Sequence, residues 1–299
     1  MTNTINTLDI QTYNDNMQML SQQMTSRFRG AVMEGMHTGE SARVVDQIGS
    51  VRMQKKTQKH ADNIIVDTPH DARWVYHDPY YTGDYIDEED RLTIGIAPDG
   101  HYVKAGVYAG NNEIDHMIID SFFGDARTGS KGQIVTSFDA SNVINANVGA
   151  SAATGMNTTK LLRARKGLIG YDIELDDPSN QMFCGITEAE EEDLINQVKV
   201  SSRDFQDSAV LSGNGTKLDS WFGINFIVST KLKNDGTNVH CPFWVKSGMH
   251  LGIWKDVHGD IRRDGGKQGN PIYIEAGVDA GATRTEEKKV FKILSKLRT

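Results

Sequence analysis

The sequence contains few of the features on which redox, membrane and catalytic functions depend. Its 299 residues include 2 cysteines, Cys184 and Cys241, which form no metal or redox motif and are expected to be reduced, half-buried thiols. No apolar run approaches the ~18–20 residues of a membrane span, and the polar N-terminus is unlike a signal peptide. Catalytic motifs such as GxSxG, HExxH or a Walker loop are absent, which lowers the probability of an enzyme, although a spatially assembled site leaves no such mark.

Acidic residues outnumber basic ones. The chain has 40 Asp and Glu against 32 Lys and Arg, giving a net charge of −8. A protein dedicated to coating nucleic acid would normally be basic. The balance therefore fits a soluble particle that does not adhere to a nearby anionic polymer.

The longest regular pattern runs from Pro98 to Gly124 and predicts a helix. Proline or aspartate suits the first turn, and glycine is a natural stop. The residues that share one stripe, at spacings of three and four, are Val103, Val107, Ile114, Met117, Ile118, Ser121 and Phe122. At about 1.5 Å per residue this helix would extend roughly 37–40 Å. Its glycines, including Gly106 and Gly110, each cost about 1 kcal/mol relative to alanine, so the first half needs an element packed closely against it.

The N-terminal region is thin and polar. Apolar residues recur every three or four positions from Tyr13 onward, which predicts a helix over Asn14–Met36. Such an amphipathic arm docks either on its own chain or on another surface, and the pattern leaves both open. The apolar positions concerned include Met17, Leu20, Met24 and Phe28.

A polar hairpin is expected over residues 37–82. Ala42–Val51 and Asn63–Thr68 are strand-like runs that flank the basic segment Arg52–His60. This basic segment is either a solvated face or a contact with an acidic neighbour or with phosphate.

An acidic stretch, Asp84–Asp90, follows the hairpin. Together with His70 and His77 it would suggest a metal site, but the histidine spacing matches no standard ligand pattern. The preferred interpretation is an acidic turn or a patch that faces a neighbouring molecule.

The remainder alternates helices and strands, as in α+β proteins. A second helix, Asn157–Gly170, carries the basic residues Lys160, Arg163, Arg165 and Lys166. This face is interpreted as a helix surface or a salt-bridge partner for a neighbour's acids, with an inner DNA-facing patch as the alternative. The other expected elements are the strand Gln181–Ile186, a helix to about Gln197 opened by the capping box Thr187–Glu190, the strand Phe222–Ser229, the apolar runs Val239–Val245 and Met249–Asp256, and the strands Pro271–Ala280 and Lys288–Leu297 joined by Gly281–Arg284.

In this order, the segments resemble the tailed-bacteriophage major capsid proteins of the Hong-Kong-97 type. The likeness covers nearly the whole chain, and the order of the parts carries it because each motif alone is weak. The matching parts are the arm, the hairpin, the entry Tyr85–Asp87, the spine stretch with Glu113–Ile119 and Gly124–Gly129, the helix Leu161–Ile169, the step Met182–Thr187, the strand Phe222–Ser229, and a long β-segment with Gly277, Gly281 and Arg284. The resemblance implies an α+β, Hong-Kong-97-like capsid fold.

The resemblance also implies a domain organisation. It comprises an N-terminal arm at 1–36, an E-loop hairpin at 37–82, a P-domain at 83–130 and 266–285 with the spine helix at about 98–124, and an A-domain at 131–265 and 286–299. The candidates for contacts between subunits are Arg52, Lys55, Lys56 and Lys59 in the hairpin, Asp87, Glu88 and Glu89 in the acidic entry, and Met17, Leu20, Met24 and Phe28 in the arm. Gly106 and Gly110 are the candidates for flexing of the spine helix.

The expected function is that of a non-enzymatic major capsid protein with no cofactor or metal. Copies would form hexamers and pentamers of an icosahedral shell around phage double-stranded DNA, which they contact non-specifically, after assembly in the host cytoplasm and without a membrane. The expected partners are other copies, a portal protein and, as an option, decoration proteins. Because the arm begins almost at Met1, a separate scaffolding protein is also expected unless a longer precursor was trimmed.

Two other functions stay open. An encapsulin-like shell would store a cargo enzyme, and a soluble α+β metal-dependent enzyme would use His70, His77 and the acids of Asp84–Asp90.

Some members of the family that the chain resembles crosslink an E-loop lysine to an asparagine. Lys55, Lys56 and Lys59 lie in the corresponding hairpin, but their partners cannot be assigned, so no catalytic residue is named.

Overall fold

The computed structural model describes residues 22–53, 67–87, 99–197 and 220–298, and also positions 55, 58, 65, 211–212 and 217–218. The chain forms two compact units. Unit 1 contains Pro79–Glu113, Lys255–Val278 and residues 22–25, and unit 2 contains Ser26–Asp78, Ile114–Trp254 and Asp279–Thr299. Residues 255–265, which the sequence assigned to the A-domain, therefore group with the first half of the long helix.

The described elements form four sheets. Their orders are β1-β14-β15-β4, β10-β9, β11-β12-β8-β13-β16-β7 and β2-β3-β5-β6. In chain order the elements are β1 (Met33–Met36), β2 (Ser41–Ile48), β3 (His70–Tyr76), β4 (Asp78–Ile86), α2 (Asp99–Phe123), β5 (Ala126–Thr128), β6 (Ile134–Thr136), β7 (Val143–Ile144), α3 (Thr158–Gly170), β8 (Met182–Ile186), α4 (Glu188–Ile195), β9 (Leu211–Ser212), β10 (Lys217–Leu218), β11 (Ser220–Trp221), β12 (Ile224–Val228), β13 (Asn238–Val245), β14 (Met249–Arg263), β15 (Ile272–Arg284) and β16 (Val290–Lys296).

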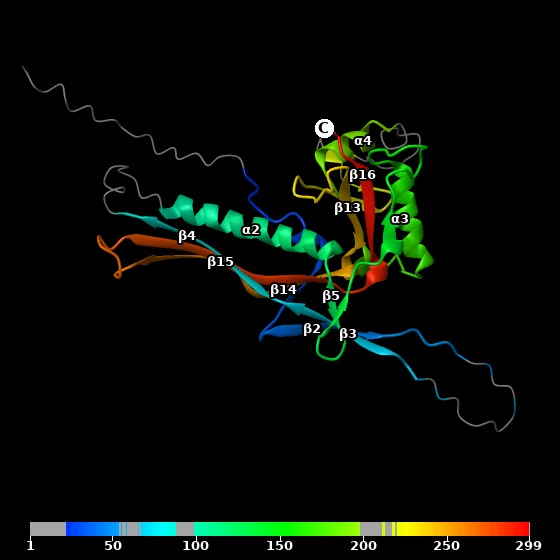
Figure 1. Ribbon diagram of the computed structural model, residues 1–299, viewed down its shortest axis with the longest axis horizontal. Helices are drawn as coiled ribbons and strands as arrows, with labels where there is room; N and C mark the ends of the chain where they lie inside the picture. Colours follow the sequence, from blue (N-terminus) through cyan, green and yellow to red (C-terminus); the bar gives the residue numbers. More distant parts are fainter. Residues whose placement is uncertain are drawn as a thin grey trace, which may run out of the picture. The chain divides into compact units, whose positions relative to one another are not determined.

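The long helix is confirmed as α2, and in unit 1 its first half packs closely on strands (Figure 1). A Cβ added to Gly106 would lie 2.5 Å from the Cβ of Ala276 in β15, and one added to Gly110 would lie 2.8 Å from Cγ1 of Val257 in β14. Both distances are shorter than any ordinary carbon contact. The two glycines therefore allow the helix and the strands to approach, which offsets their low helix propensity.

Replacing Gly106 with alanine is expected to destabilise the chain by up to about 2 kcal/mol. The gain of about 1 kcal/mol in helix propensity is outweighed by overlap with Ala276, because overpacking typically costs about 1–3 kcal/mol. The additional change Ala276→Gly should recover much of the loss in urea unfolding, since it removes the atom that clashes. Gly170→Ala is the matched control, because a Cβ there meets nothing within 4 Å. Equal effects of Gly106→Ala with and without Ala276→Gly would contradict the close-packing explanation.

The six-stranded sheet forms the core of unit 2 and is covered on both faces. On one face, the ring of Trp244 lies 6.0 Å from that of Phe28, 4.5 Å from Phe122 and 5.8 Å from Phe183. The indole Nε1 of Trp244 also donates to the carbonyl of Ala31 at 2.9 Å. These contacts place the segment around Phe28 in the core of its own chain.

Helices α3 and α4 contact strands of the same sheet (Figure 1). Asn157 caps α3 by accepting from the amide of Lys160, and the predicted capping box of α4 is present at Thr187 and Glu190. Gly167 gives α3 room over β16, because an added Cβ would lie 2.5 Å from Cζ of Phe291.

Cys184 is a free thiol beneath these helices, as is Cys241. Both are fully buried instead of half-buried, and burial raises the pKa of each thiol.

Two sequence predictions about elements are wrong. The helix predicted for Asn14–Met36 is not formed in its described part: a 3-10 turn (Arg29–Ala31) leads into β1, which pairs in parallel with β14 from His250 to Ile253. Residues 14–21 lie outside the described residues. The expected connector Gly281–Arg284 is the end of β15, where a Cβ on Gly281 would lie 1.9 Å from the carbonyl oxygen of Tyr76. Pairing with distant segments explains both results.

Candidate functional site

The hairpin of β2 and β3 presents apolar side chains with no cover from the described chain. The two strands pair from Ser41 with Tyr76 to Ile48 with His70. Beyond this ladder the exposed fractions are 98% for Met53 and 91% for Ile65. Met53 and Ile65 therefore make almost no stabilising contact with the described chain.

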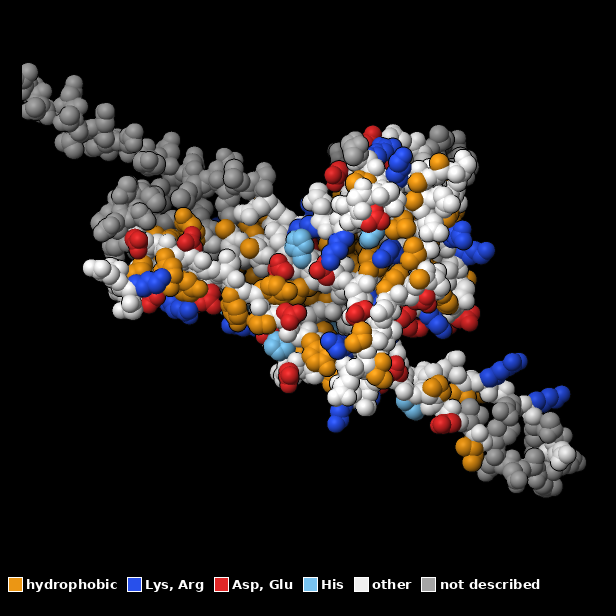
Figure 2. Space-filling model, viewed as in Figure 1, with side chains coloured by type: hydrophobic (Ala, Val, Ile, Leu, Met, Phe, Trp, Pro, Cys, Tyr) orange, Lys and Arg blue, Asp and Glu red, His pale blue; other side chains and the backbone are white. Residues whose placement is uncertain are grey.

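Of the basic candidates in this hairpin, Arg52 and Lys55 are exposed. Lys56 and Lys59 lie outside the described residues, as does half of the strand-like run Asn63–Thr68. The hairpin thus combines exposed apolar and cationic side chains. Figure 2 shows blue side chains and orange side chains on this segment.

The arm and acidic candidates divide into three groups. Met24 is 60% exposed and Asp87 is also exposed, so both are available to a partner. Phe28 is fully buried within its own chain, so its assignment as an inter-subunit contact is wrong. The candidates Met17, Leu20, Glu88 and Glu89 lie outside the described residues.

Asp115 holds the segment that contains Phe28. This carboxylate is fully buried on α2 and accepts hydrogen bonds from the backbone N–H groups of Arg27 at 3.1 Å and Phe28 at 3.2 Å. The hydroxyl of Ser26 donates to it at 2.5 Å. Sequence reasoning missed this role, for which the available signal was an acid beside Ile114 on the buried stripe of the helix.

Arg284 joins the end of β15 to the end of α2. Its side chain is 1% exposed, and Nη1 donates to the carbonyls of Ser121 and Phe122, each at 3.1 Å, and to that of Gly124. Nε donates to the carboxylate of Glu287 at 2.9 Å. A cation at the C-terminus of a helix satisfies carbonyls that have no partner within the helix.

Lys160, which the sequence placed on a basic helix face, is fully buried. Its Nζ donates to the carbonyls of Thr154 and Gly155 at 2.8 Å each and to that of Leu294 at 3.0 Å. Burial lowers the pKa of this ammonium group to about 8. Lys160 therefore ties the loop before α3 to β16 and is not available to DNA or to a neighbour.

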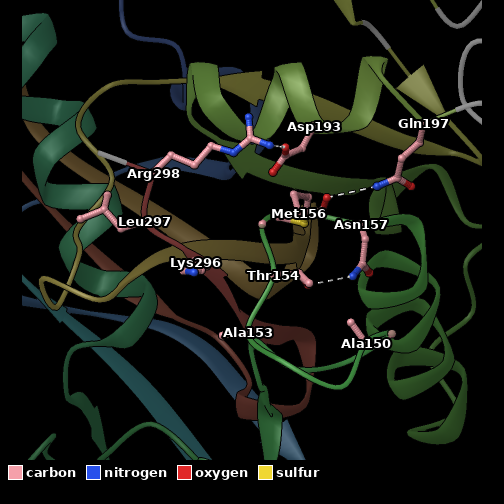
Figure 3. A pocket seen from close by; sticks show the side chains of 12 residues that line it. Ala150, Ala153, Thr154, Met156, Asn157, Asp193, Gln197, Lys296, Leu297 and Arg298 are labelled. Atoms are coloured by element: carbon pink, nitrogen blue, oxygen red, sulfur yellow. Dashed lines mark hydrogen bonds and ion pairs between the residues drawn. The ribbon is translucent and has the colours of Figure 1, made fainter.

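An open groove of about 830 Å³ lies beside this loop, between the end of α4 and the C-terminal residues (Figure 3). The carboxylate of Asp193 forms an ion pair with Arg298 across it. Gln197 donates to the carbonyl of Met156 at 3.2 Å and accepts from the amide of Thr158 at 3.1 Å. These polar groups bond to one another or to the backbone. They form a structural network along the groove and resemble no acid–base site.

Of the residues proposed for a metal-dependent enzyme, His77 is engaged in other contacts. His77 Nδ1 lies 2.6 Å from the carboxylate of Asp279, and its ring stacks on Trp254 at 4.8 Å. Within the described ranges, no three His, Cys, Asp or Glu side chains are grouped so that they could hold a metal. Also among the described residues, no helix is long and apolar enough to span a bilayer.

A pair of histidines joins β1 to β14. The Nε2 atoms of His37 and His250 lie 2.9 Å apart, over the paired glycines Gly35 and Gly252. His250 is 6% exposed, and its Nδ1 is a buried atom with no hydrogen-bond partner in the described structure. Burial, followed by the charge of His37, lowers the pKa of His250 to about 4.

This pair predicts a loss of stability in acid. Because the folded-state pKa lies below the unfolded value of about 6.5, the unfolded chain binds the proton first. The contribution of His250 to the free energy of unfolding is therefore fully present above about pH 6.5. It falls by roughly 3 kcal/mol as the pH drops to about 4. Urea unfolding at pH 7, 5.5 and 4.5 should show a smaller decline for His250→Gln than for the unmodified chain. Parallel declines for the two chains would contradict this role.

Comparisons with known proteins agree with the architecture. A family model described as phage capsid protein matches residues 5–296. Similar solved structures include the capsid of cyanophage P-SCSP1u (13% identity, 96% of this chain and 93% of that chain, TM-score 0.68), the capsid of cyanophage Pam1 (8%, 95% and 95%, 0.70) and the capsid of Ralstonia phage GP4 (12%, 100% and 99%, 0.63). No curated protein sequence matches the chain.

These identities are low, so the solved structures support the α+β capsid fold, whereas the family model establishes membership. Together they favour a phage capsid over the encapsulin-like shell and the metal-dependent enzyme. With a family match that spans nearly all of its residues, this chain belongs to the phage capsid protein family, as a non-enzymatic major capsid protein of an icosahedral virion shell.

Proposed function

We propose that copies of this chain form hexamers and pentamers that close the shell around double-stranded DNA, and that the β2–β3 hairpin is the E-loop reaching over a neighbouring copy. The observation that supports this is the near-complete exposure of Met53 and Ile65. Burying such side chains against a neighbour releases about 25 cal/mol per Å² of apolar surface. A segment with few contacts of its own is stabilised by assembly, which makes closure of the shell cooperative.

The other parts have corresponding roles in this proposal. The residues before Ser26 act as the N-terminal arm, and α2 acts as the spine helix of the P-domain. Gly106 and Gly110 let this helix flex as the shell matures. Assembly takes place in the host cytoplasm with a scaffolding protein and a portal protein. The net charge of −8 keeps contact with the packaged DNA weak and non-specific.

The test is to express the chain with a scaffolding protein and to image the product by electron microscopy. Closed particles tens of nanometres across are expected, and monomers or dimers under every condition would overturn the proposal. The paired change Met53→Ser and Ile65→Ser should leave the unfolding midpoint of the free subunit unchanged, because these side chains have almost no intrachain contacts. It should reduce the yield of shells at least tenfold. Met53→Leu with Ile65→Val is the matched control and should assemble normally.

A further inference from the structure

The turn between β11 and β12 has an unusual residue at its tip. Trp221 pairs with Ile224, so the connection consists of Phe222 and Gly223 alone, with φ of 54° and 77°. Positive φ at both central positions is the type I′ turn, which strongly prefers Asn-Gly. A bulky aromatic residue in the left-handed region is an outlier, and such strain concentrates at functional positions.

The ring of Phe222 stands at the surface next to α3. Its side chain is 53% exposed, and the guanidinium carbon of Arg165 lies 4.3 Å from the ring centroid. This cation–π contact holds the ring against the helix. Phe222 is therefore a large, oriented and uncovered aromatic side chain, which is typical of an interface anchor.

Two more uncovered apolar residues lie on the same helix. Leu162 is 43% exposed and Ile169 is 52% exposed. They are seven residues apart, with Arg165 between them, so all three share one stripe of α3. We call Leu162, Arg165, Ile169 and Phe222 the Phe222 patch.

Positive charge borders this patch. Arg163 and Lys166 are exposed on α3, and neither forms an ion pair with any acid in the described ranges. Figure 2 shows blue side chains along the edge of the unit that carries α3. The surface thus combines an apolar centre with a cationic rim, as interfaces between proteins do.

We propose that the Phe222 patch is a contact surface for a second copy of this chain. The proposal rests on the proposed assembly into rings and names one of the surfaces that would form them. Phosphate backbones are bound by clustered cations and backbone N–H groups, not by Leu, Ile and Phe side chains, so the apolar centre disfavours DNA as the occupant.

Charge identifies the opposing surface. The loop after α3 exposes the carboxylates of Asp172, Glu174 and Asp176, and none of them has an ion pair within the described structure. Rings of identical subunits need a head-to-tail contact in which two different surfaces meet. The acidic loop of one copy therefore meets the Arg163 and Lys166 rim of the next.

Phe222→Asn separates an interface role from a turn role. Asparagine suits the left-handed turn, so the free subunit should unfold at a temperature equal to or a few degrees above that of the unmodified chain. Assembly, measured as the yield of capsomers and shells at fixed concentration, should fall at least tenfold. Phe222→Tyr retains the ring and should assemble normally. Wild-type assembly of Phe222→Asn would overturn the proposal.

The charged rim is tested by exchange. Arg163→Glu with Lys166→Glu should reduce assembly, and adding Asp172→Lys with Glu174→Lys should restore part of it. If the charge-reversed chain forms normal shells that retain less DNA, DNA is the occupant and the proposal is overturned. Failure of the exchange to restore assembly would also overturn the proposal. If the unmodified chain forms no shells, the assembly function itself fails. If it forms shells that Phe222→Asn does not alter, only the patch is overturned.

Discussion

Replacing Arg284 with methionine should lower the free energy of unfolding by about 3–5 kcal/mol, the range for removing one member of a buried ion pair. Three carbonyls at the end of α2 would lose their donor, namely those of Ser121, Phe122 and Gly124. Methionine fills most of the volume but donates no hydrogen bond. The carboxylate of Glu287 would keep Arg73 at 3.3 Å and lose Arg284 at 2.9 Å. Equilibrium unfolding in urea measures the loss.

Arg284→Lys is the informative comparison. An ammonium group keeps the positive charge but cannot bridge the helix end and Glu287 at once, because it lacks the planar fork of the guanidinium. We therefore expect a loss between those of the unmodified and methionine chains. A change of less than about 1 kcal/mol for methionine would show that water replaces the guanidinium without penalty, contrary to the role assigned here.

Local patterns predicted the elements whose cause is local. The periodicity from Val103 to Phe122 corresponds to α2, and the capping box at Thr187 and Glu190 starts α4. The prediction of a helix over Asn14–Met36 was wrong for a different reason. Phe28 and Met36 have helical spacing, but Phe28 is buried under Trp244 and Met36 pairs in a strand with Ile253. Contacts this distant in sequence outweigh a weak amphipathic pattern.

The buried charged side chains show the same limit of prediction from local sequence patterns. Lys160 and Arg284 are satisfied mainly by backbone carbonyls, which every residue possesses, so no pattern of side chains marks their partners. On α3, Lys160 was grouped with Arg163, Arg165 and Lys166, and a sequence cannot tell which of four cations turns inward. In the hairpin, the strand-like run Ala42–Val51 corresponds to β2, whereas β3 (His70–Tyr76) begins after the predicted run Asn63–Thr68, whose described residues Ile65, Asp67 and Thr68 are not in a strand.

Phe222 adds the converse lesson. The strand from Phe222 to Ser229 was predicted by its apolar run, and the first two of its residues are in fact the turn. Phenylalanine at a position that favours asparagine conceals the turn from sequence reasoning. Phe222 breaks this local rule while its ring, in contact with Arg165 and Trp221, stays 53% exposed, which supports the proposed requirement outside the chain.

Replacing Asp115 with alanine should cost about 3–4 kcal/mol and should act first on the segment Ser26–Ala31. The backbone N–H groups of Arg27 and Phe28 and the hydroxyl of Ser26 would lose their acceptor, and unsatisfied buried donors cost about 1–3 kcal/mol each before relaxation. Because Phe28 and Ala31 both contact Trp244, release of this segment should change tryptophan emission at urea concentrations below global unfolding. Asp115→Asn keeps one acceptor oxygen and should lose less.

A double-mutant cycle decides whether Asp115 and Phe28 act as one unit. Phe28→Ala removes the buried ring and should itself cost about 3–5 kcal/mol, while leaving the backbone donors to Asp115 in place. If the carboxylate serves to hold Phe28 in the core, the double variant should lose clearly less than the sum of the single losses, because releasing the segment once removes both contributions. Additive losses would mean that the two contacts are independent and that Asp115 does not anchor the segment Ser26–Ala31 through Phe28. In the coupled case, the same carboxylate fixes the position of Ser26–Phe28, so both single variants should also reduce shell yield in proportion to the fraction of subunits with a released segment.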